Sequence, residues 1–129
     1  MSKEYIKELD LDFGPDGSTL IPVVTQDSKT KEVLILSFAN KAAFDETVKS
    51  GYATYWSRSR NELWKKGMTS GDMLKIIEIR INCEQNSLLY LVKPQGEGAC
   101  HAKKADGKAH TSCYYRKINS DNSLTFVEE

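Results

Sequence analysis

The chain has 129 residues, the size of one ordinary domain, and its 40% hydrophobic and 28% charged content is normal for a globular protein. Lysine plus arginine and aspartate plus glutamate both number 18, so the formal net charge is zero. This balance argues against general binding to nucleic acid or to a membrane surface, because such proteins usually carry a basic excess. It leaves room for a local basic pocket.

The sequence shows no segment that would direct the chain into or across a membrane. The longest apolar run, Leu88–Val92, is far short of the ~20 residues that a membrane span needs. The first residues are charged and lack the apolar segment of a secretory signal. We therefore expect a cytoplasmic protein whose thiols stay reduced.

The first half of the chain predicts an arm, a hairpin, a helix and a further strand. Residues 1–16 are acidic and polar, which predicts a peripheral N-terminal arm. Residues 20–25 and 32–38 flank a polar turn and predict a β-hairpin. A helix follows, because Asn40 is a good N-cap and Gly51 suits a C-terminal stop. Within it, Phe44 and Val48 lie four residues apart on one face, and residues 53–56 then predict another strand.

The second half predicts three further strands. Isoleucines alternate with polar residues from Ile77 to Cys83, which predicts the clearest strand of the chain. A polar turn leads into a strand over 87–93, so these two strands form a second hairpin, and 113–118 predicts a closing strand. Residues 119–129 form a turn-like tail with one short strand. The sum is an α+β domain, mainly antiparallel β-sheet with one or two helices.

Three cysteines, Cys83, Cys100 and Cys113, form the first candidate site. An odd number fits a disulfide framework poorly, and the absence of a Cys-x-x-Cys pair argues against a zinc ribbon or finger. On spacing alone, inert buried thiols explain these residues as well as a metal site does. The metal is favoured because Cys100 and Cys113 border one loop rich in glycine and lysine, and because Cys83 ends a strand, where a ligand can be aimed.

Three thiolates would leave the fourth position of a zinc ion open for water, as in catalytic sites. Such a centre carries a net charge of −1, so it should acidify its water only with help from a nearby cation, a base or a second metal. His101, next to Cys100, is the candidate general base or acid, with an exposed loop histidine as the alternative. The role of His110, in the same loop, stays open.

The segment from Trp56 to Gly71 is a candidate site for a phosphorylated small molecule. Arginine binds phosphate through two parallel hydrogen bonds, serine, threonine and glycine let backbone N–H groups approach the oxygens, and tryptophan can cover a base. A charged surface loop with packed tryptophans is the alternative. The expected substrate-binding residues are Trp56, Arg58, Ser59, Arg60, Trp64, Lys66, Thr69, Ser70 and Gly71.

In this order, these residues resemble the phosphoribosyl-AMP cyclohydrolase family of histidine biosynthesis. The resemblance covers about Gly17 to Lys117, which makes residues 17–118 a cyclohydrolase-like catalytic domain. The segments that carry it are Leu20-Ile21-Pro22, Gln26-Asp27, Trp56-Ser57-Arg58-Ser59-Arg60, Glu62-Leu63-Trp64, Lys66-Gly67, Thr69-Ser70-Gly71, Ala99-Cys100-His101 and Ser112-Cys113-Tyr114-Tyr115-Arg116.

The resemblance implies a hydrolase that opens the purine ring of phosphoribosyl-AMP by adding water at C6 and breaking the N1–C6 bond. It implies zinc on Cys83, Cys100 and Cys113, magnesium as a second metal, and an intertwined homodimer in which cysteines of both subunits meet at each zinc. His101 would assist proton transfer, and the Arg58–Gly71 segment would hold the phosphates.

Two departures from the family pattern bear on the activity. The usual magnesium segment, Asp-Cys-Asp-x-Asp, here reads Asn82-Cys83-Glu84-Gln85-Asn86. Magnesium prefers charged oxygens, so we expect weak or absent binding at Asn82, Glu84 and Asn86. The loop between Cys100 and Cys113 is also longer than usual, and its Lys103 and Lys104 are candidates for contacting a phosphate. Two alternatives follow: a related zinc hydrolase acting on another purine-like nucleotide ring, and a non-catalytic, zinc-stabilised nucleotide-binding module.

Overall fold

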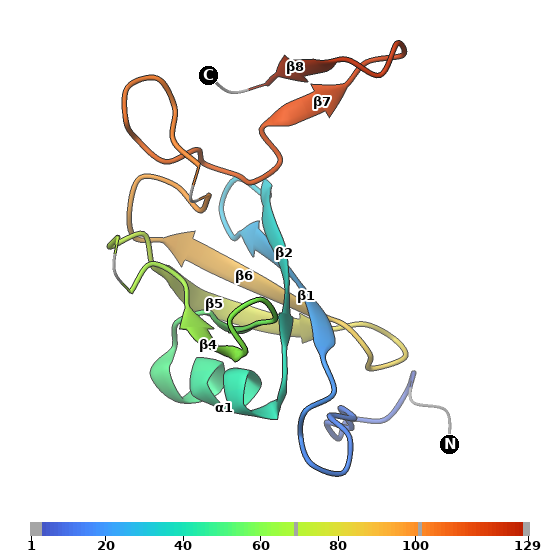
Figure 1. Ribbon diagram of the computed structural model, residues 1–129. Coiled ribbons are helices and arrows are strands. Elements are labelled where there is room, and N and C mark those ends of the chain that lie inside the picture. The colour runs from blue at the N-terminus through green and yellow to red at the C-terminus, as the bar shows by residue number, and fades with distance from the viewer. Residues whose placement is uncertain (1–3, 69, 101, 128–129) are drawn as a thin grey trace.

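The computed structural model describes residues 4–68, 70–100 and 102–127, and within these it contains one helix and eight strands (Figure 1). The expected α+β class is confirmed. In chain order the elements are β1 (Ile21–Asp27), β2 (Val33–Ala39), α1 (Lys41–Ser50), β3 (Thr54–Ser57), β4 (Glu62–Lys65), β5 (Leu74–Ile81), β6 (Leu88–Pro94), β7 (Arg116–Ile118) and β8 (Leu124–Phe126).

The central sheet has four strands in the order β2-β1-β6-β5. The two predicted hairpins, β1–β2 and β5–β6, are both present and antiparallel. They join through β1 and β6, which pair in parallel, so the sheet is mixed rather than purely antiparallel. Two smaller hairpins, β3–β4 and β7–β8, stand outside this sheet.

Strand β5 differs from the prediction at both of its ends. It begins at Leu74, which is fully buried, and it ends at Ile81, so Cys83 lies in the following turn instead of in the strand. The pairing register shifts between Ile76 and Glu78, and Ile77 at this irregularity is 54% exposed. A bulge adds a residue to one strand and so resets its inward-outward alternation. The isoleucine alternation therefore does not mark one continuous buried face.

Helix α1 begins and ends where the sequence predicts. The Asn40 side chain accepts a hydrogen bond from the Ala43 N–H at 2.9 Å, and Gly51, with φ of 79°, donates its N–H to the Thr47 carbonyl. Of the two apolar residues that the sequence places on one face, Phe44 packs against the core, whereas Val48 is 59% exposed. The buried stripe runs through Ala43 and Thr47, since the Thr47 hydroxyl accepts the Thr54 N–H and ties the helix to β3.

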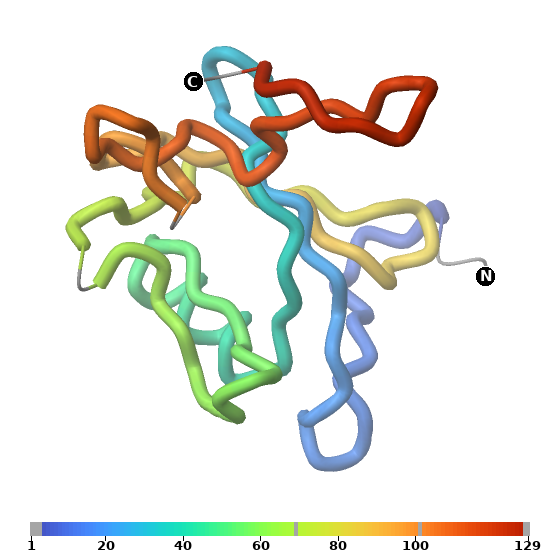
Figure 2. Tube along the Cα trace, turned by 45° about the horizontal axis from the view of Figure 1, so that its top comes forward, coloured from blue at the N-terminus to red at the C-terminus, as the bar shows by residue number. Residues whose placement is uncertain are grey.

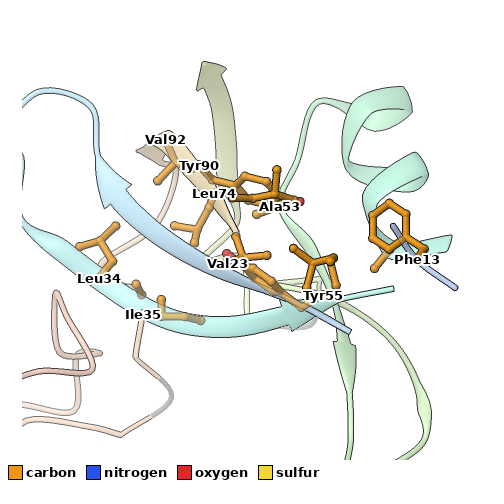
Figure 3. Packing of buried hydrophobic residues seen from close by; sticks show 14 residues of the cluster. Phe13, Val23, Leu34, Ile35, Ala53, Tyr55, Leu74, Tyr90 and Val92 are labelled. Carbon is orange, nitrogen blue, oxygen red and sulfur yellow. The ribbon is translucent and has the colours of Figure 1, made fainter. Parts of the chain in front are cut away.

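The core lies between the sheet and the layer formed by α1 and β3 (Figure 3). Val23 and Tyr90 from the sheet meet Tyr55 from β3, and all three are fully buried. The Tyr55 hydroxyl shares a 2.6 Å hydrogen bond with the Thr25 hydroxyl, which satisfies two buried polar groups at once. From the N-terminal arm, Phe13 reaches this core and packs on Phe44, with ring centroids 5.8 Å apart.

No helix in the described part of the chain is long and apolar enough to span a membrane.

Candidate metal centre and nucleotide site

Cys100 and Cys113 lie side by side, although a long loop separates them in sequence. The Cys100 N–H donates to the His110 carbonyl at 3.1 Å, and the Ala99 N–H donates to the Thr111 carbonyl at 3.0 Å, so the two ends of the loop are paired. Cys113 is fixed to the edge of the sheet by its N–H, which donates to the Leu34 carbonyl of β2 at 2.8 Å. The Cys100 thiol is close enough to the Cys113 thiol to raise its pKa.

The environment of the pair disfavours two free thiolates. Desolvation, and then the hydrogen bond and charge of Cys100, raise the pKa of Cys113 to about 12, whereas Lys66 acts in the opposite direction. Without a cation the Cys113 thiol therefore keeps its proton at neutral pH. Zinc binds thiolates and displaces such protons, so the donor chemistry of this pair fits zinc.

Cys83 is exposed in the turn between β5 and β6, and this turn lies at the opposite end of β6 from the Cys100 loop (Figures 1 and 2). Strand β6 has seven residues, which at ~3.3 Å each corresponds to about 23 Å. Zinc–sulfur bonds are ~2.3 Å long, so one chain cannot place all three sulfurs on one ion. In agreement, the described residues contain no group of three or more His, Cys, Asp or Glu side chains that could hold a metal.

The turn around Cys83 does not fit magnesium. Asn82 Oδ1 accepts hydrogen bonds from the N–H groups of Asn86 and Ser87, at 2.8 and 2.9 Å. Asn82 Nδ2 donates to Asn86 Oδ1 at 2.5 Å, and Asn86 Nδ2 donates to Glu84 Oε2 at 3.3 Å. The side-chain amides thus satisfy one another and the backbone, and both amide oxygens that could coordinate a cation already accept N–H groups.

Most of the Trp56–Gly71 segment belongs to the β3–β4 hairpin, because Glu62–Lys65 forms strand β4 against β3, and we call the segment the Trp56–Gly71 hairpin. Its turn places Arg58 with the guanidinium 4.3 Å from the centroid of the Phe38 ring. The Ser57 hydroxyl accepts the Arg60 N–H at 3.3 Å and lies 3.4 Å from the Ser59 hydroxyl. The turn therefore gathers two exposed arginines and two hydroxyls.

Two pockets adjoin this hairpin, with Trp64 in the wall of both. The first has a volume of about 540 Å³ and includes Trp56, Arg58 and Ser59, while the second, of about 480 Å³, includes Arg60, Lys66 and Ser70. Trp64 packs on the buried Tyr55, with ring centroids 5.7 Å apart, which holds the indole in place.

Gly71, another predicted member of the site, lines neither of these pockets. Gly71 is exposed and closes a turn in which its N–H donates to the Gly67 carbonyl at 2.8 Å. Thr69 and His101 lie outside the described residues. His110 is only 3% exposed and stacks on Tyr115, with ring centroids 3.8 Å apart and planes within 8°. Its Nδ1 is buried and has no hydrogen-bond partner.

Sequence reasoning missed Asp72, which joins the hairpin to the cysteine loop. Asp72 is 8% exposed, and its Oδ1 accepts the Glu97 N–H at 2.9 Å, three residues before Cys100. The Ser70 hydroxyl accepts the Asp72 N–H at 3.2 Å. The missed signal is its place directly after Thr69-Ser70-Gly71, the last motif of the segment.

The sequence model that describes phosphoribosyl-AMP cyclohydrolase matches residues 35–115, a range that contains the hairpin and all three cysteines. The chain belongs to this family. Phosphoribosyl-AMP cyclohydrolase from Archaeoglobus fulgidus is 50% identical over 113 residues, which cover 88% of this chain and 96% of that protein. The enzyme of the same name from Desulfatibacillum aliphaticivorans is 44% identical over 121 residues, covering 94% and 90% of the two chains.

A third relative is the histidine biosynthesis bifunctional protein HisIE from Aquifex aeolicus, which is 41% identical over 113 residues. These cover 88% of this chain and 51% of that protein. Phosphoribosyl-AMP cyclohydrolases are hydrolases that act on a cyclic amidine in histidine biosynthesis, and the chain is an enzyme of this type. The alternative of a non-catalytic nucleotide-binding module is therefore set aside.

Proposed function

We propose that this enzyme opens the purine ring of phosphoribosyl-AMP. Water adds at C6, the N1–C6 bond breaks, and a proton passes to N1 to give the formimino-carboxamide ribotide. The observation that carries this proposal is the junction of the Cys100–Cys113 pair with the Trp56–Gly71 hairpin through Asp72. It sets a pair of soft metal ligands beside pockets lined by arginine and tryptophan.

We further propose that zinc is shared between two copies of the chain. Cys100 and Cys113 of one copy would be completed by Cys83 of the other, because one chain cannot bring the three together. A homodimer is supported by hairpin β7–β8, whose six strand residues are all exposed. An isolated two-stranded hairpin is marginal in water, and Ile118 and Phe126 here are 76% and 54% exposed, so a second copy is the expected cover.

The roles of the residues follow from their places. Bound zinc would supply a Lewis acid that makes a water molecule more acidic. His101, adjacent to Cys100 in sequence, would take a proton from that water and return it to the leaving nitrogen. Arg58 and Arg60 are exposed at the hairpin turn and would hold phosphate, while the Trp64 indole would pack against the base.

The remaining predicted contacts belong to the same proposal. Trp56 would cover the base from the other pocket, and the Ser59 and Ser70 hydroxyls would donate to phosphate oxygens. Magnesium is not proposed as a cofactor at Asn82, Glu84 and Asn86.

The test is turnover of phosphoribosyl-AMP by the purified protein loaded with zinc, with and without added magnesium. We expect an ordinary enzymatic rate, on the order of 1–10³ s⁻¹, that magnesium does not change. The matched control is Cys100→Ser, which should lose zinc and turnover together. Absence of turnover in folded wild-type protein that holds zinc would refute the substrate and favour another purine-like nucleotide ring.

A further inference from the structure

Lys66 is unusual because it is a lysine in the interior. It is 4% exposed, and among the described lysines it alone is buried. Lysine is almost never fully buried unless its charge is paired, since desolvating an ammonium group is costly. Its position therefore calls for a specific negative partner.

The backbone around Lys66 is held tightly. The Lys66 N–H donates to the Ala53 carbonyl at 3.2 Å, which anchors the end of β4. Gly67, with φ of 82°, then turns the chain so closely onto Asp72 that a Cβ atom at Gly67 would lie 2.2 Å from the Asp72 carbonyl carbon. The lysine is thus presented inward by a turn that only glycine fits.

Two of the cysteines are among the groups that interact electrostatically with the Lys66 ammonium. Burial lowers its pKa, whereas Asp72, Cys113 and Cys100 each act to raise it, and Lys103 acts to lower it. Two of its three favourable partners are therefore the sulfurs that fit zinc. Asp72 is already held by the Glu97 N–H, so this carboxylate ties the lysine to the loop that carries Cys100.

We propose that Lys66 is a positioning residue of the metal centre, whose ammonium offsets the negative charge of the Cys100 and Cys113 thiolates and so raises their affinity for zinc. This inference rests on the proposed function, since it requires zinc on these cysteines. A zinc ion with three thiolates carries −1, and the adjacent Lys66 ammonium and Asp72 carboxylate offset each other, so without the lysine the surroundings of the zinc would be more negative by one charge. A less negative centre acidifies its water more strongly.

The competing assignment of Lys66 is the predicted one, a contact to substrate phosphate. Arg58 and Arg60 are exposed and have free access to a ligand, whereas Lys66 is covered on most sides. Its ammonium also lies 5.9 Å from the centroid of the Trp64 ring, on the wall of the smaller pocket. The two roles separate in measurement, because one acts through the metal and the other through the substrate.

The experiment compares Lys66→Met and Lys66→Arg with wild type. Zinc affinity is measured by competition with a chromophoric chelator, and kcat and KM are measured on zinc-saturated enzyme. We expect Lys66→Met to weaken zinc binding at least tenfold and to lower kcat with KM unchanged, and Lys66→Arg to restore most of the affinity. Lys65→Met is the matched control: Lys65 pairs with Glu46 at 3.1 Å, and its loss should leave zinc affinity unchanged.

Unchanged zinc affinity together with a raised KM in Lys66→Met would overturn the proposal and assign the lysine to phosphate. If Lys66→Met does not fold by circular dichroism, Lys66→Gln, which keeps a polar end without the charge, carries the same expectation. Titration of wild type with zinc distinguishes a failure of the proposed function from a failure of the Lys66 proposal. A wild-type protein that binds zinc no better than Cys100→Ser refutes the proposed function, whereas tight wild-type binding that Lys66→Met retains refutes only this proposal.

Discussion

Replacing Gly67 with alanine tests the packing that joins the hairpin to the cysteine loop. Gly67 and Gly71 have similar left-handed backbones, with φ of 82° and 86°. A Cβ atom at Gly67 would meet the Asp72 carbonyl carbon and the Met73 nitrogen at 2.2 and 2.3 Å, whereas a Cβ atom at Gly71 would meet nothing within 4 Å. Gly71→Ala is therefore a matched control that shares the backbone strain and lacks the clash.

The expected losses of stability follow from these two contributions. A left-handed conformation costs an L-residue roughly 1–2 kcal/mol, and this applies to both variants. Overpacking costs typically about 1–3 kcal/mol more, and the upper part of that range fits Gly67 because the atoms it would meet are backbone. We expect Gly71→Ala to lose about 1–2 kcal/mol and Gly67→Ala about 3–5 kcal/mol of the roughly 5–15 kcal/mol typical of a domain.

Urea unfolding followed by tryptophan fluorescence measures both variants, since Trp56 and Trp64 lie in the same hairpin. The slope of the free energy against urea concentration should stay unchanged, so that the midpoint alone reports stability. Equal losses in the two variants would show that the close approach of Gly67 to Asp72 is absent from the protein in solution.

The amide network at the Cys83 turn predicts that millimolar magnesium leaves the melting temperature of wild type unchanged. In the double variant Asn82→Asp, Asn86→Asp, the melting temperature should depend on magnesium. A wild-type melting temperature that depends on magnesium would contradict this. Arg58→Ala should raise KM about ten- to a hundredfold with little change in kcat, because a charge-assisted hydrogen bond is worth about 1.5–3 kcal/mol. Arg80→Ala is its control and should leave KM unchanged, because Arg80 pairs with Glu78 and lines neither pocket. Removing zinc with a chelator should shift the sedimentation profile from dimer toward monomer, and an unchanged profile would argue against a shared metal.

Features set by neighbouring residues were predictable from the sequence. The ends of α1 depend on the Asn40 side chain and on the left-handed Gly51, both local, and both were predicted correctly. The β1–β2 and β5–β6 hairpins likewise depend on short polar turns between apolar runs. Their joining through a parallel β1–β6 pair depends on long-range packing, which no local pattern encodes.

The candidate site was predictable in composition but not in arrangement. The sequence identified the cysteines and the arginine-rich hairpin, because these residue types carry recognisable chemistry. It could not show that Cys100 and Cys113 meet while Cys83 lies a strand-length away, since that depends on the direction of β6. Nor could it separate the buried Lys66 from the exposed Arg60, because exposure is decided by the turn at Gly67 and its contact with Asp72.

In the proposed dimer, the turn around Cys83 and the Lys66 ammonium both affect the net charge of the shared zinc centre. A second copy would bring Cys83 to the zinc together with the side chains on either side of it. With Asn82 and Asn86 at these places, the turn contributes one carboxylate, Glu84, rather than a full acidic cluster, and its amides are already satisfied by hydrogen bonds. Fewer acids then surround the centre than in a full acidic cluster, and the buried Lys66 ammonium offsets part of the remaining negative charge. The double variant Asn82→Asp, Asn86→Asp would place two more negative charges near the shared zinc. Its zinc affinity should therefore depend on magnesium, whereas that of wild type should not.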